Sequence, residues 1–324
     1  MRRRKFIALA GGAAAWSGVA LAQKLKKPAR LAFLFFGSPS SPYDRSLIDA
    51  FRQGLRQAGL VENQDIVLDV VWVTDPEQAV RDAIQHGADM LIPCGSSTSV
   101  VAKRHGSTIP IVFVSVGDPV GMGLVESLSR PGGNVTGFSD ILGELSGKLV
   151  DVALELSKPQ TTVDYLWHTN WPDGQNRYQL TEQAAQSRGV RLRHRGIGDI
   201  AEINDALAAM RQGGAMTVVI QPSPLTYGNR QRIIDLAMNY RLGTIFAFPV
   251  AAREGALVGY GPDYVHMYRK VPFYVEHVLK GMKPADLPIE RPNKVELVVN
   301  LKTAKAQGFE VPLPLLIRAD ELID

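Results

Sequence analysis

The feature that most constrains the fold is a regular alternation of short apolar runs and longer amphipathic segments. Apolar runs without helical spacing predict strands, and segments whose apolar residues recur at helical spacing predict helices. Strands that alternate with helices in this way favour a parallel sheet with helices on both faces. In the first half of the chain, strands are expected at 31–36, 66–73, 90–93 and 109–116, and helices at 43–58, 75–87 and 96–105.

The alternation occurs twice along the chain. A segment rich in proline and glycine, residues 129–140, interrupts it, and the pattern then resumes from 143 to 248. The expected fold class is therefore α/β, with two Rossmann-like lobes whose parallel sheets are joined by hinge crossings. The expected N-terminal lobe comprises 29–138 and about 255–282, and the expected C-terminal lobe comprises 139–254 and about 283–324.

The first 22 residues have the layout of an export signal. A basic head precedes a mildly apolar middle and small residues at Ala20 and Ala22, which is typical of a cleaved secretory leader. Arg3 and Arg4 give the head a twin-arginine form. The alternative is an uncleaved membrane anchor, which the three glycines of the short apolar part disfavour. We therefore interpret residues 1–22 as a signal peptide of the twin-arginine type.

The leader also accounts for the net charge of the chain. It contains four of the 36 basic residues and none of the 32 acidic ones, so the rest of the chain has no formal net charge. Nucleic-acid binding depends on clustered basic residues that neutralise phosphates. The composition therefore argues against a nucleic-acid partner.

The sequence lacks the usual residue patterns of enzymes and metal sites. The six histidines show no metal-ligand spacing, and neither a zinc-protease nor a serine-hydrolase motif occurs. The single cysteine, Cys94, has no cysteine partner for a disulfide, no obvious base beside it, and no place at the signal junction where a lipid would attach. We therefore expect no catalysis, no metal and no cofactor.

The stretch LIPCGSSTSVV, residues 91–101, places four hydroxyl side chains directly after an apolar strand. Gly95 would let the backbone approach a ligand closely, and Ser96, Ser97 and Thr98 would offer hydroxyl groups at the start of a helix. The free N–H groups and partial positive charge of a helix N-terminus suit an anion. A ligand carboxylate would fit there without any Lys or Arg. Alternatively, Ser96 or Ser97 simply caps the helix.

Other strand-to-helix turns carry further candidates, because ligands of open parallel α/β sheets bind beyond the carboxyl ends of the strands. Two aspartates in these turns, Asp118 and Asp263, either bind the ligand or cap the helices that follow them. Three aromatic residues, Tyr43, Trp171 and Tyr227, form walls for a planar or apolar ligand or instead pack the lobes together. The complete expected ligand-binding set is Ser38, Tyr43, Gly95, Ser96, Ser97, Thr98, Asp118, Asn170, Trp171, Gln221, Ser223 and Asp263.

Several stretches spread over nearly the whole chain carry a family resemblance. They include RRRKFIALAGGAAAW, FRQGLRQAGLVENQDI, IPIVFVSVGDPVGMGLVESLSRPGGNVTGFS, LVGYGPDY and ELVVNLKTAKAQGFEVP. In these stretches the chain resembles the ABC transporter substrate-binding protein family that includes the tryptophan-binding TrpX type. The resemblance implies a type I periplasmic-binding fold, with two Rossmann-like lobes, three hinge strands and a ligand site between the lobes. It also suggests an amino acid, or a related small aromatic or apolar carboxylate, as the ligand.

The sequence differs from that family at two turns of the expected cleft. Asn170-Trp171-Pro172 stands where the family often has Asn-Pro, and Gln221 stands where an acidic residue is common. Both differences fall where a ligand would bind. They bear on which ligand is bound more than on the fold.

Together these observations predict an extracytoplasmic solute-binding protein of an ABC importer. Its expected location is the periplasm, its expected partners are a small-molecule ligand and an ABC permease with its ATPase, and the protein itself is expected to be a monomer. Two alternatives share the same cleft, namely a ligand-sensing module for a membrane receptor and an exported hydrolase. A DNA-binding repressor of this fold would need a headpiece, for which the leader leaves no room.

Overall fold

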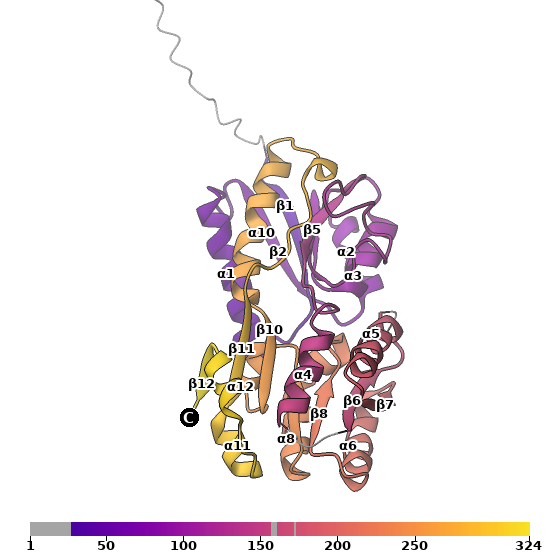
Figure 1. Cartoon of the computed structure of the whole chain (residues 1–324). Helices are drawn as coiled ribbons and strands as arrows, with labels where there is room; N and C mark the ends of the chain where they lie inside the picture. Colours follow the sequence, from indigo (N-terminus) through magenta and orange to yellow (C-terminus); the bar gives the residue numbers. More distant parts are fainter. Residues whose placement is uncertain (1–26, 157–160, 172) are drawn as a thin grey trace, which may run out of the picture.

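The computed structural model describes residues 27–156, 161–171 and 173–324. The expected signal peptide, residues 1–22, lies outside these ranges. The described chain forms two lobes, which lie one above the other in Figure 1, and each lobe is built around one sheet. This arrangement confirms the expected α/β fold with two Rossmann-like lobes.

The first lobe contains a five-stranded parallel sheet in the order β2-β1-β3-β4-β5. All of β3 and nearly all of β4 are buried, as expected for parallel strands that are covered on both faces. The strands are β1 (Ala29–Phe35), β2 (Ile66–Trp72), β3 (Met90–Pro93), β4 (Ile111–Val116) and β5 (Val135–Ser139). The helices of this lobe are α1 (Pro42–Gln57), α2 (Pro76–Gln85), α3 (Ser96–His105) and α10 (Tyr264–Leu279).

The second lobe contains a seven-stranded sheet in the order β12-β11-β10-β9-β8-β6-β7, in which the described pairs are parallel except for β10 with β11. Its strands are β6 (Thr162–His168), β7 (Arg191–Ile197), β8 (Thr217–Ile220), β9 (Gly243–Phe246), β10 (Val258–Pro262), β11 (Val295–Asn300) and β12 (Glu321–Ile323). Its helices are α4 (Ser146–Leu156), α5 (Gly174–Ser187), α6 (Ile203–Gln212), α7 (Pro224–Gly228), α8 (Arg230–Asn239), α9 (Pro249–Arg253), α11 (Leu301–Gln307) and α12 (Leu313–Arg318).

Within the described residues, the chain crosses between the lobes three times: after β5, between β10 and α10, and before β11. The segment that includes residues 284–290 follows α10 and still lies against the first lobe. There the Glu290 amide donates to the Gly137 carbonyl at 3.0 Å, and the Ser139 amide donates to the Glu290 carbonyl at 2.9 Å. The expected boundaries differ from this at two points, because β10 belongs to the second sheet and residues 284–290 lie against β5.

Strand β10 joins the second sheet because its glycines allow close packing. A Cβ atom at Gly259 would come 2.6 Å from the Phe248 carbonyl oxygen, so only glycine lets the start of α9 lie this close to the strand. In that position β10 pairs with β9 on one side and with β11 on the other. The close approach of α9 therefore determines that β10 lies beside β9 in the second sheet.

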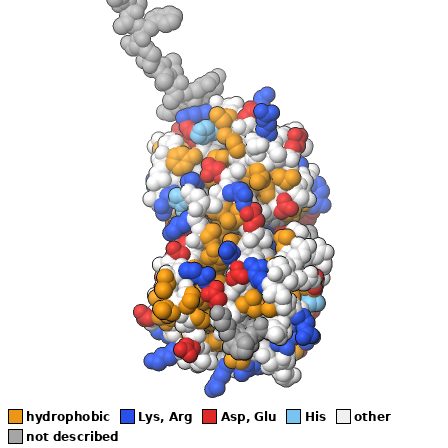
Figure 2. Space-filling view, viewed as in Figure 1, with side chains coloured by type: hydrophobic (Ala, Val, Ile, Leu, Met, Phe, Trp, Pro, Cys, Tyr) orange, Lys and Arg blue, Asp and Glu red, His pale blue; other side chains and the backbone are white. Residues whose placement is uncertain are grey.

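Three further observations concern the helices, the surface and the metal-ligating residues of the described chain. None of the helices in the described ranges combines the length and the apolar character needed to cross a bilayer. On the face shown in Figure 2, basic and acidic side chains are interspersed over both lobes. Three or more His, Cys, Asp or Glu side chains do not come together as a metal site anywhere in the described chain.

Candidate ligand-binding cleft

A cavity of about 270 Å³ lies between the lobes, at the carboxyl ends of both sheets. Residues from β1, β3 and β4 and from the loops after β5, β6, β8 and β9 line it, so both lobes contribute. An apolar protein cavity of roughly 150 Å³ accepts benzene. The cavity therefore has room for a small ligand that carries a ring.

On the first-lobe side of the cavity, the lining residues change from apolar to charged along the edge of the sheet, because of the order of the strands. Phe35 and Phe36 follow β1, Gly95 follows β3, Ser115 lies near the end of β4, and Asp140 follows β5. Because neighbouring strands lie about 4.8 Å apart, these residues form a row across the edge of the sheet. The aromatic end of the row, at β1, is therefore three strand spacings from Asp140, which follows β5.

The second lobe repeats this polarity. Phe248 follows β9 and Ser223 follows β8, while Trp171 and Arg177 come after β6. Phe36 lies close to the second lobe near Gly228, and Arg177 lies close to the first lobe at Gly117, so like ends face each other. The cavity thus has one aromatic end and one end with polar and charged groups.

The start of α3 lines the cavity between these two ends. Gly95 has φ +80°, a conformation that favours glycine, and no side chain in the described residues caps the helix. Ser96, Ser97 and Thr98 line the cavity beside it. The alternative that Ser96 or Ser97 caps α3 is therefore not what the structure has, and the first N–H groups of the helix are left for a ligand.

Trp171 and Ser223 also line the cavity as expected. Ser223 is at the same time the N-cap of α7, because its hydroxyl accepts the Thr226 amide at 3.2 Å. Together with the α3 residues, half of the expected set borders the cavity. Contact of these residues with a ligand stays a prediction.

Two expected aspartates cap turns instead of lining the cavity. Asp118 accepts the Gly121 amide at 2.8 Å and is exposed. Asp263 is the N-cap of α10 and accepts the His266 amide at 2.9 Å. The capping alternative therefore describes Asp263, whereas Asp118 caps a turn that is not followed by a helix in the described residues before β5.

Two expected amides of the second lobe also lie off the cavity. Gln221 is fully buried, and its side chain accepts the His168 amide at 3.0 Å and donates to the Gly174 carbonyl at 2.9 Å. Asn170 is exposed and donates to the Gly198 carbonyl at 3.4 Å. Both side chains stabilise loops that follow the strands. Their hydrogen bonds are made with backbone groups and not, as was expected, with a ligand.

The remaining two expected residues belong to the start of α1. Ser38 forms a hydroxyl pair with Ser40 at 2.7 Å on the surface. Tyr43 packs against the hydrophobic core, and this burial raises the pKa of its hydroxyl well above the ordinary value. Ser41, which accepts the Asp44 amide at 3.1 Å, takes the N-cap position instead. Neither Ser38 nor Tyr43 lines the cavity.

The sequence did not predict the charged groups of the cavity. Arg177 is only 3% exposed, and its Nε donates to Asp173 Oδ2 at 2.5 Å. Its Cζ lies 5.1 Å from the centroid of the Trp171 ring. Burial alone would lower the pKa of the Arg177 guanidinium, but Asp140 and Asp173 raise it overall, so Arg177 is charged. A buried, charged arginine therefore lines the cavity in addition to the expected residues.

Asp140 is the acidic counterpart at the same end. It is 3% exposed, and its carboxylate accepts the Ser115 hydroxyl and the Leu142 amide, both at 3.0 Å. Burial raises the pKa of Asp140, although Arg177 and these hydrogen bonds act against the rise. A signal for the basic partner was present in the sequence, since Asp173 and Arg177 are four residues apart, the spacing of an ion pair on one helix face.

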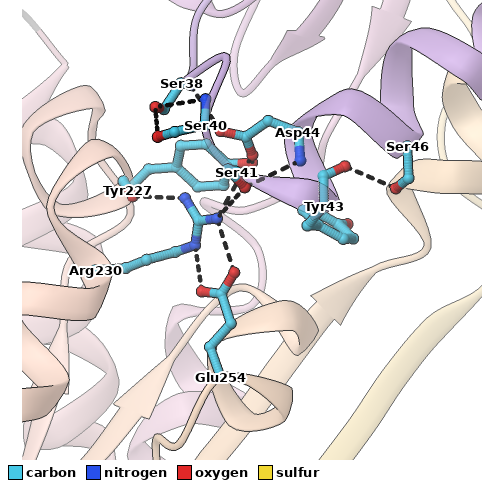
Figure 3. A network of polar contacts seen from close by, with 9 residues as sticks. All are labelled: Ser38, Ser40, Ser41, Tyr43, Asp44, Ser46, Tyr227, Arg230 and Glu254. Carbon is cyan, nitrogen blue, oxygen red and sulfur yellow. Dashed lines mark hydrogen bonds and ion pairs between the residues drawn. The ribbon is translucent and has the colours of Figure 1, made fainter.

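The lobes also touch through a polar network beside the cavity, which Figure 3 shows. From the second lobe, Tyr227 donates to Asp44 Oδ1 at 2.7 Å, and Arg230 donates to the Ser41 hydroxyl at 3.1 Å. Arg230 is held in turn by Glu254, at 2.6 and 2.9 Å. Tyr227 therefore lines the cavity and joins the lobes at once.

Cys94 borders the cavity but is a poor nucleophile. Burial raises the pKa of its thiol to about 12, although a hydrogen bond with Tyr268 acts in the opposite direction. The reactive form of cysteine is the thiolate, which is scarce at such a pKa. Cys94 is better described as part of the apolar wall.

Comparisons with known proteins agree with this architecture. A tyrosine-binding protein of Clostridioides difficile is 26% identical over 227 residues, and the match covers 68% of this chain but only 64% of that protein, less than two thirds of its length. A conserved domain protein from Vibrio cholerae has a TM-score of 0.82 and 24% identity, with 91% of this chain and all of that chain covered. An ABC domain from Streptococcus pneumoniae, solved in complex with L-Trp, has a TM-score of 0.82 and 19% identity, with 92% of this chain and all of that one covered.

The two solved structures confirm the fold, and the family assignment rests on the sequence. The sequence profile of the family described as ABC transporter substrate binding protein matches residues 45–323. This match includes both lobes and every residue that lines the cavity from α1 onward. The chain therefore belongs to the ABC transporter substrate-binding protein family.

Proposed function

We propose that this protein is the extracytoplasmic solute-binding protein of an ABC importer and that it binds an amino acid with an aromatic or apolar side chain. The observation that carries the proposal is the polarity of the cavity. Groups of both charge signs, Asp140 and Arg177, lie at one end together with the Trp171 ring, and the other end has aromatic rings without charged groups, those of Phe36, Tyr227 and Phe248. An amino acid with a ring has the same polarity.

The row of residues across the first sheet suggests how the ligand lies. Its side chain would occupy the aromatic end, between Phe36 of the first lobe and Tyr227 and Phe248 of the second. Its carboxylate would accept hydrogen bonds from the N–H groups at the start of α3, as expected for an anion at a helix N-terminus. Its ammonium group would face Asp140.

The charge balance around Asp140 favours an amino acid over an aromatic acid that lacks an ammonium group. In the described residues around this end, the two carboxylates of Asp140 and Asp173 face the single guanidinium of Arg177. A buried charge is costly unless it is paired. A ligand ammonium would supply the missing positive charge beside Asp140.

The comparisons support the same ligand class. One relative is named for tyrosine binding, and one solved structure of this fold contains L-Trp. Both ligands are amino acids with a ring. They therefore guide the choice of compounds for a direct test.

In the proposed cycle, ligand contacts from both lobes favour the closed form. A ligand shifts a conformational equilibrium only by its difference in affinity for the two forms, and an open form would offer contacts from one lobe only. An ABC permease with its ATPase would then recognise the closed protein. The proposal includes export to the periplasm through the twin-arginine leader at residues 1–22, which rests on the sequence alone.

A thermal-shift screen of the mature protein tests this function. We expect L-tryptophan, L-tyrosine and other apolar L-amino acids to raise the melting temperature, because a ligand at about 100 times its Kd stabilises a protein by about 2.7 kcal/mol. Indole-3-propionic acid and 4-hydroxyphenylpropionic acid, which lack the ammonium group, should give little or no shift. If no amino acid shifts the melting temperature, the proposal is wrong.

Replacing Tyr227 with phenylalanine is expected to weaken amino-acid binding about tenfold. The variant keeps the ring that lines the cavity and removes the hydroxyl that reaches Asp44, so it destabilises only the form in which the lobes touch. A hydrogen bond to a charged group contributes about 1.5–3 kcal/mol, and about 1.4 kcal/mol corresponds to a tenfold change in Kd. Isothermal titration calorimetry measures the change.

Tyr178→Phe is the matched control for Tyr227→Phe. Tyr178 donates to Glu182 over the same 2.7 Å, but both residues lie on α5 within one lobe. Its removal should leave the affinity for amino acids unchanged. Equal affinity losses in the two variants would contradict a role for the contact between the lobes.

Binding is expected to weaken as the pH falls. Because burial raises the pKa of Asp140 above its ordinary value of 3.8, its carboxylate becomes protonated at a higher pH than an exposed aspartate, and the ammonium then loses its partner. By linkage, amino-acid binding should release a proton in the range where unliganded Asp140 is partly protonated. Calorimetry in buffers of different ionisation enthalpy measures this release. A Kd that stays constant from neutral pH to the ordinary aspartate range would contradict it.

A further inference from the structure

Two side chains that the second lobe contributes to the charged end of the cavity carry buried hydrogen-bond donors without partners among the described residues, and the Tyr264 hydroxyl of the first lobe is a third such group. Arg177 Nη1 and Trp171 Nε1 make no hydrogen bond with any of the described residues. Both side chains line the cavity, and they are 3% and 7% exposed. Buried donors in proteins almost always have an acceptor, so each unpartnered donor requires an explanation. Here the cavity beside them suggests that the acceptor belongs to a ligand.

Arg177 is held in a fixed position at this end. Its Nε is bonded to Asp173 at 2.5 Å, one helical turn earlier on α5. Its Nη2 reaches the first lobe, where it occupies the space that a side chain at Gly117 would fill. The guanidinium therefore spans the gap between the lobes while one of its nitrogens stays unpaired.

The first lobe offers donors across the same space. The N–H groups at the start of α3 are uncapped by any side chain in the described residues, and Ser97 and Thr98 line the cavity there. Donors from both lobes thus border one cavity. A carboxylate is the ligand group that suits this excess of hydrogen-bond donors. Its two oxygens can accept about four hydrogen bonds, and no other group of an amino acid accepts as many.

We propose that Arg177 is the second-lobe residue that binds the ligand carboxylate, opposite the N-terminus of α3, with the Trp171 indole as a further donor. The inference rests on the proposed amino-acid function and goes beyond it, because it assigns the carboxylate to both lobes. One carboxylate oxygen is held by α3 and the other by the guanidinium. The carboxylate therefore joins the lobes, and a ligand without it loses affinity for the closed form in particular.

This arrangement makes Arg177 a specificity-determining residue. The planar guanidinium suits a carboxylate because it offers parallel N–H donors in a fixed geometry. A primary amide of the same amino acid keeps the ring and the ammonium group but replaces one acceptor oxygen with a donor. Facing Arg177, that donor finds no acceptor, so the amide should bind much more weakly than the acid.

A thermodynamic cycle that changes both the ligand and Arg177 tests the proposal. Isothermal titration calorimetry would measure Kd for L-tryptophan and L-tyrosine and for their primary amides, first with the wild-type protein. The test variant combines Arg177→Gln with Asp173→Asn, which removes the guanidinium without leaving Asp173 as an unpaired buried charge. Arg177→Lys is a second variant that keeps the charge but loses the fork of donors.

A matched control combines Arg193→Gln with Asp164→Asn. This pair also joins an arginine to a buried aspartate in the second lobe, with nitrogen–oxygen distances of 2.5 and 2.8 Å, and neither residue lines the cavity. The Arg193 side chain is 40% exposed, whereas both side chains of the Arg177–Asp173 pair are buried, so this control reports the effect of losing an arginine–aspartate pair outside the cavity. Circular dichroism and the melting temperature of the unliganded proteins would verify that each variant is folded.

In the wild type and in the control, each amino acid should bind at least about tenfold more tightly than its amide, as expected for a hydrogen bond to a charged group. In the Arg177 double variant this ratio should fall towards one, and in Arg177→Lys it should be reduced. If the amino acids bind but the ratio is the same in all variants, the role of Arg177 is refuted and the proposed function stands. If no amino acid binds the folded wild type, both proposals fail together.

Discussion

Replacing Asp140 with asparagine is expected to weaken amino-acid binding by roughly 30- to 5,000-fold. The carboxylate is buried beside the cavity, and removing one partner of a buried, hydrogen-bonded charge pair costs about 2–5 kcal/mol of binding free energy. Asparagine keeps the size of the side chain and an oxygen acceptor for the Leu142 amide. Calorimetric titration of the wild type and the variant with L-tryptophan and L-tyrosine measures the loss.

The unliganded Asp140→Asn protein should be at least as stable as the wild type near neutral pH. A raised pKa means that the folded state disfavours the ionised carboxylate, so the stability contribution of Asp140 is present at low pH and is lost as the pH rises through the raised pKa. Asp164→Asn is the control, because Asp164 is equally buried but is paired with Arg193 away from the cavity. It should lower stability and leave the Kd unchanged. A similar Kd loss in both variants would refute the role of Asp140.

Replacing Gly117 with alanine is expected to weaken binding by about 10- to 100-fold. A Cβ atom at Gly117 would overlap Nη2 of Arg177, which comes from the other lobe, so the closed form must give way while an open form is unaffected. Overpacking of a tight contact costs about 1–3 kcal/mol. Because Gly117 does not have a positive φ, alanine adds no backbone strain there. The expected signature is a weaker Kd with an unchanged melting temperature of the unliganded protein.

Gly143→Ala is the control for Gly117→Ala. An added Cβ atom there would meet its nearest neighbour, Leu180 Cδ1, at 3.4 Å, which is an ordinary contact. This variant should bind amino acids as the wild type does. If Gly117→Ala also binds normally, Arg177 does not need its position beside Gly117 in the liganded form.

Most of the fold could be predicted from the sequence because it depends on local patterns. The third strand and the helix after it have the predicted bounds, 90–93 and 96–105, since an apolar run and the glycine that follows it mark the end of the strand and the start of the helix. The lobe membership of β10 could not be predicted in this way. It depends on which sheet edge the strand meets, and that is set by the close approach of α9 to Gly259.

Half of the expected residues line the cavity, and the best-predicted part of the site is the one that the backbone forms. The N-terminus of α3 follows from its strand, glycine and helix, and it lies on the cavity. Caps and ligand contacts, in contrast, use the same residue types in the same turns, so Asp118 and Asp263 could not be separated from ligand contacts by sequence. Arg177 was missed because it reaches the cavity from within α5 and not from a turn.

The three crossings of the chain have a consequence for biosynthesis. The first sheet is complete at Ser139, but α10 and residues 284–290 pack against it only after nearly all of the second lobe has been translated. A nascent chain that has emerged as far as β5 would expose apolar surface that α10 later covers, so it would be vulnerable to aggregation and would depend on chaperones. The first lobe can therefore be completed only late in synthesis, once α10 and residues 284–290 have emerged from the ribosome.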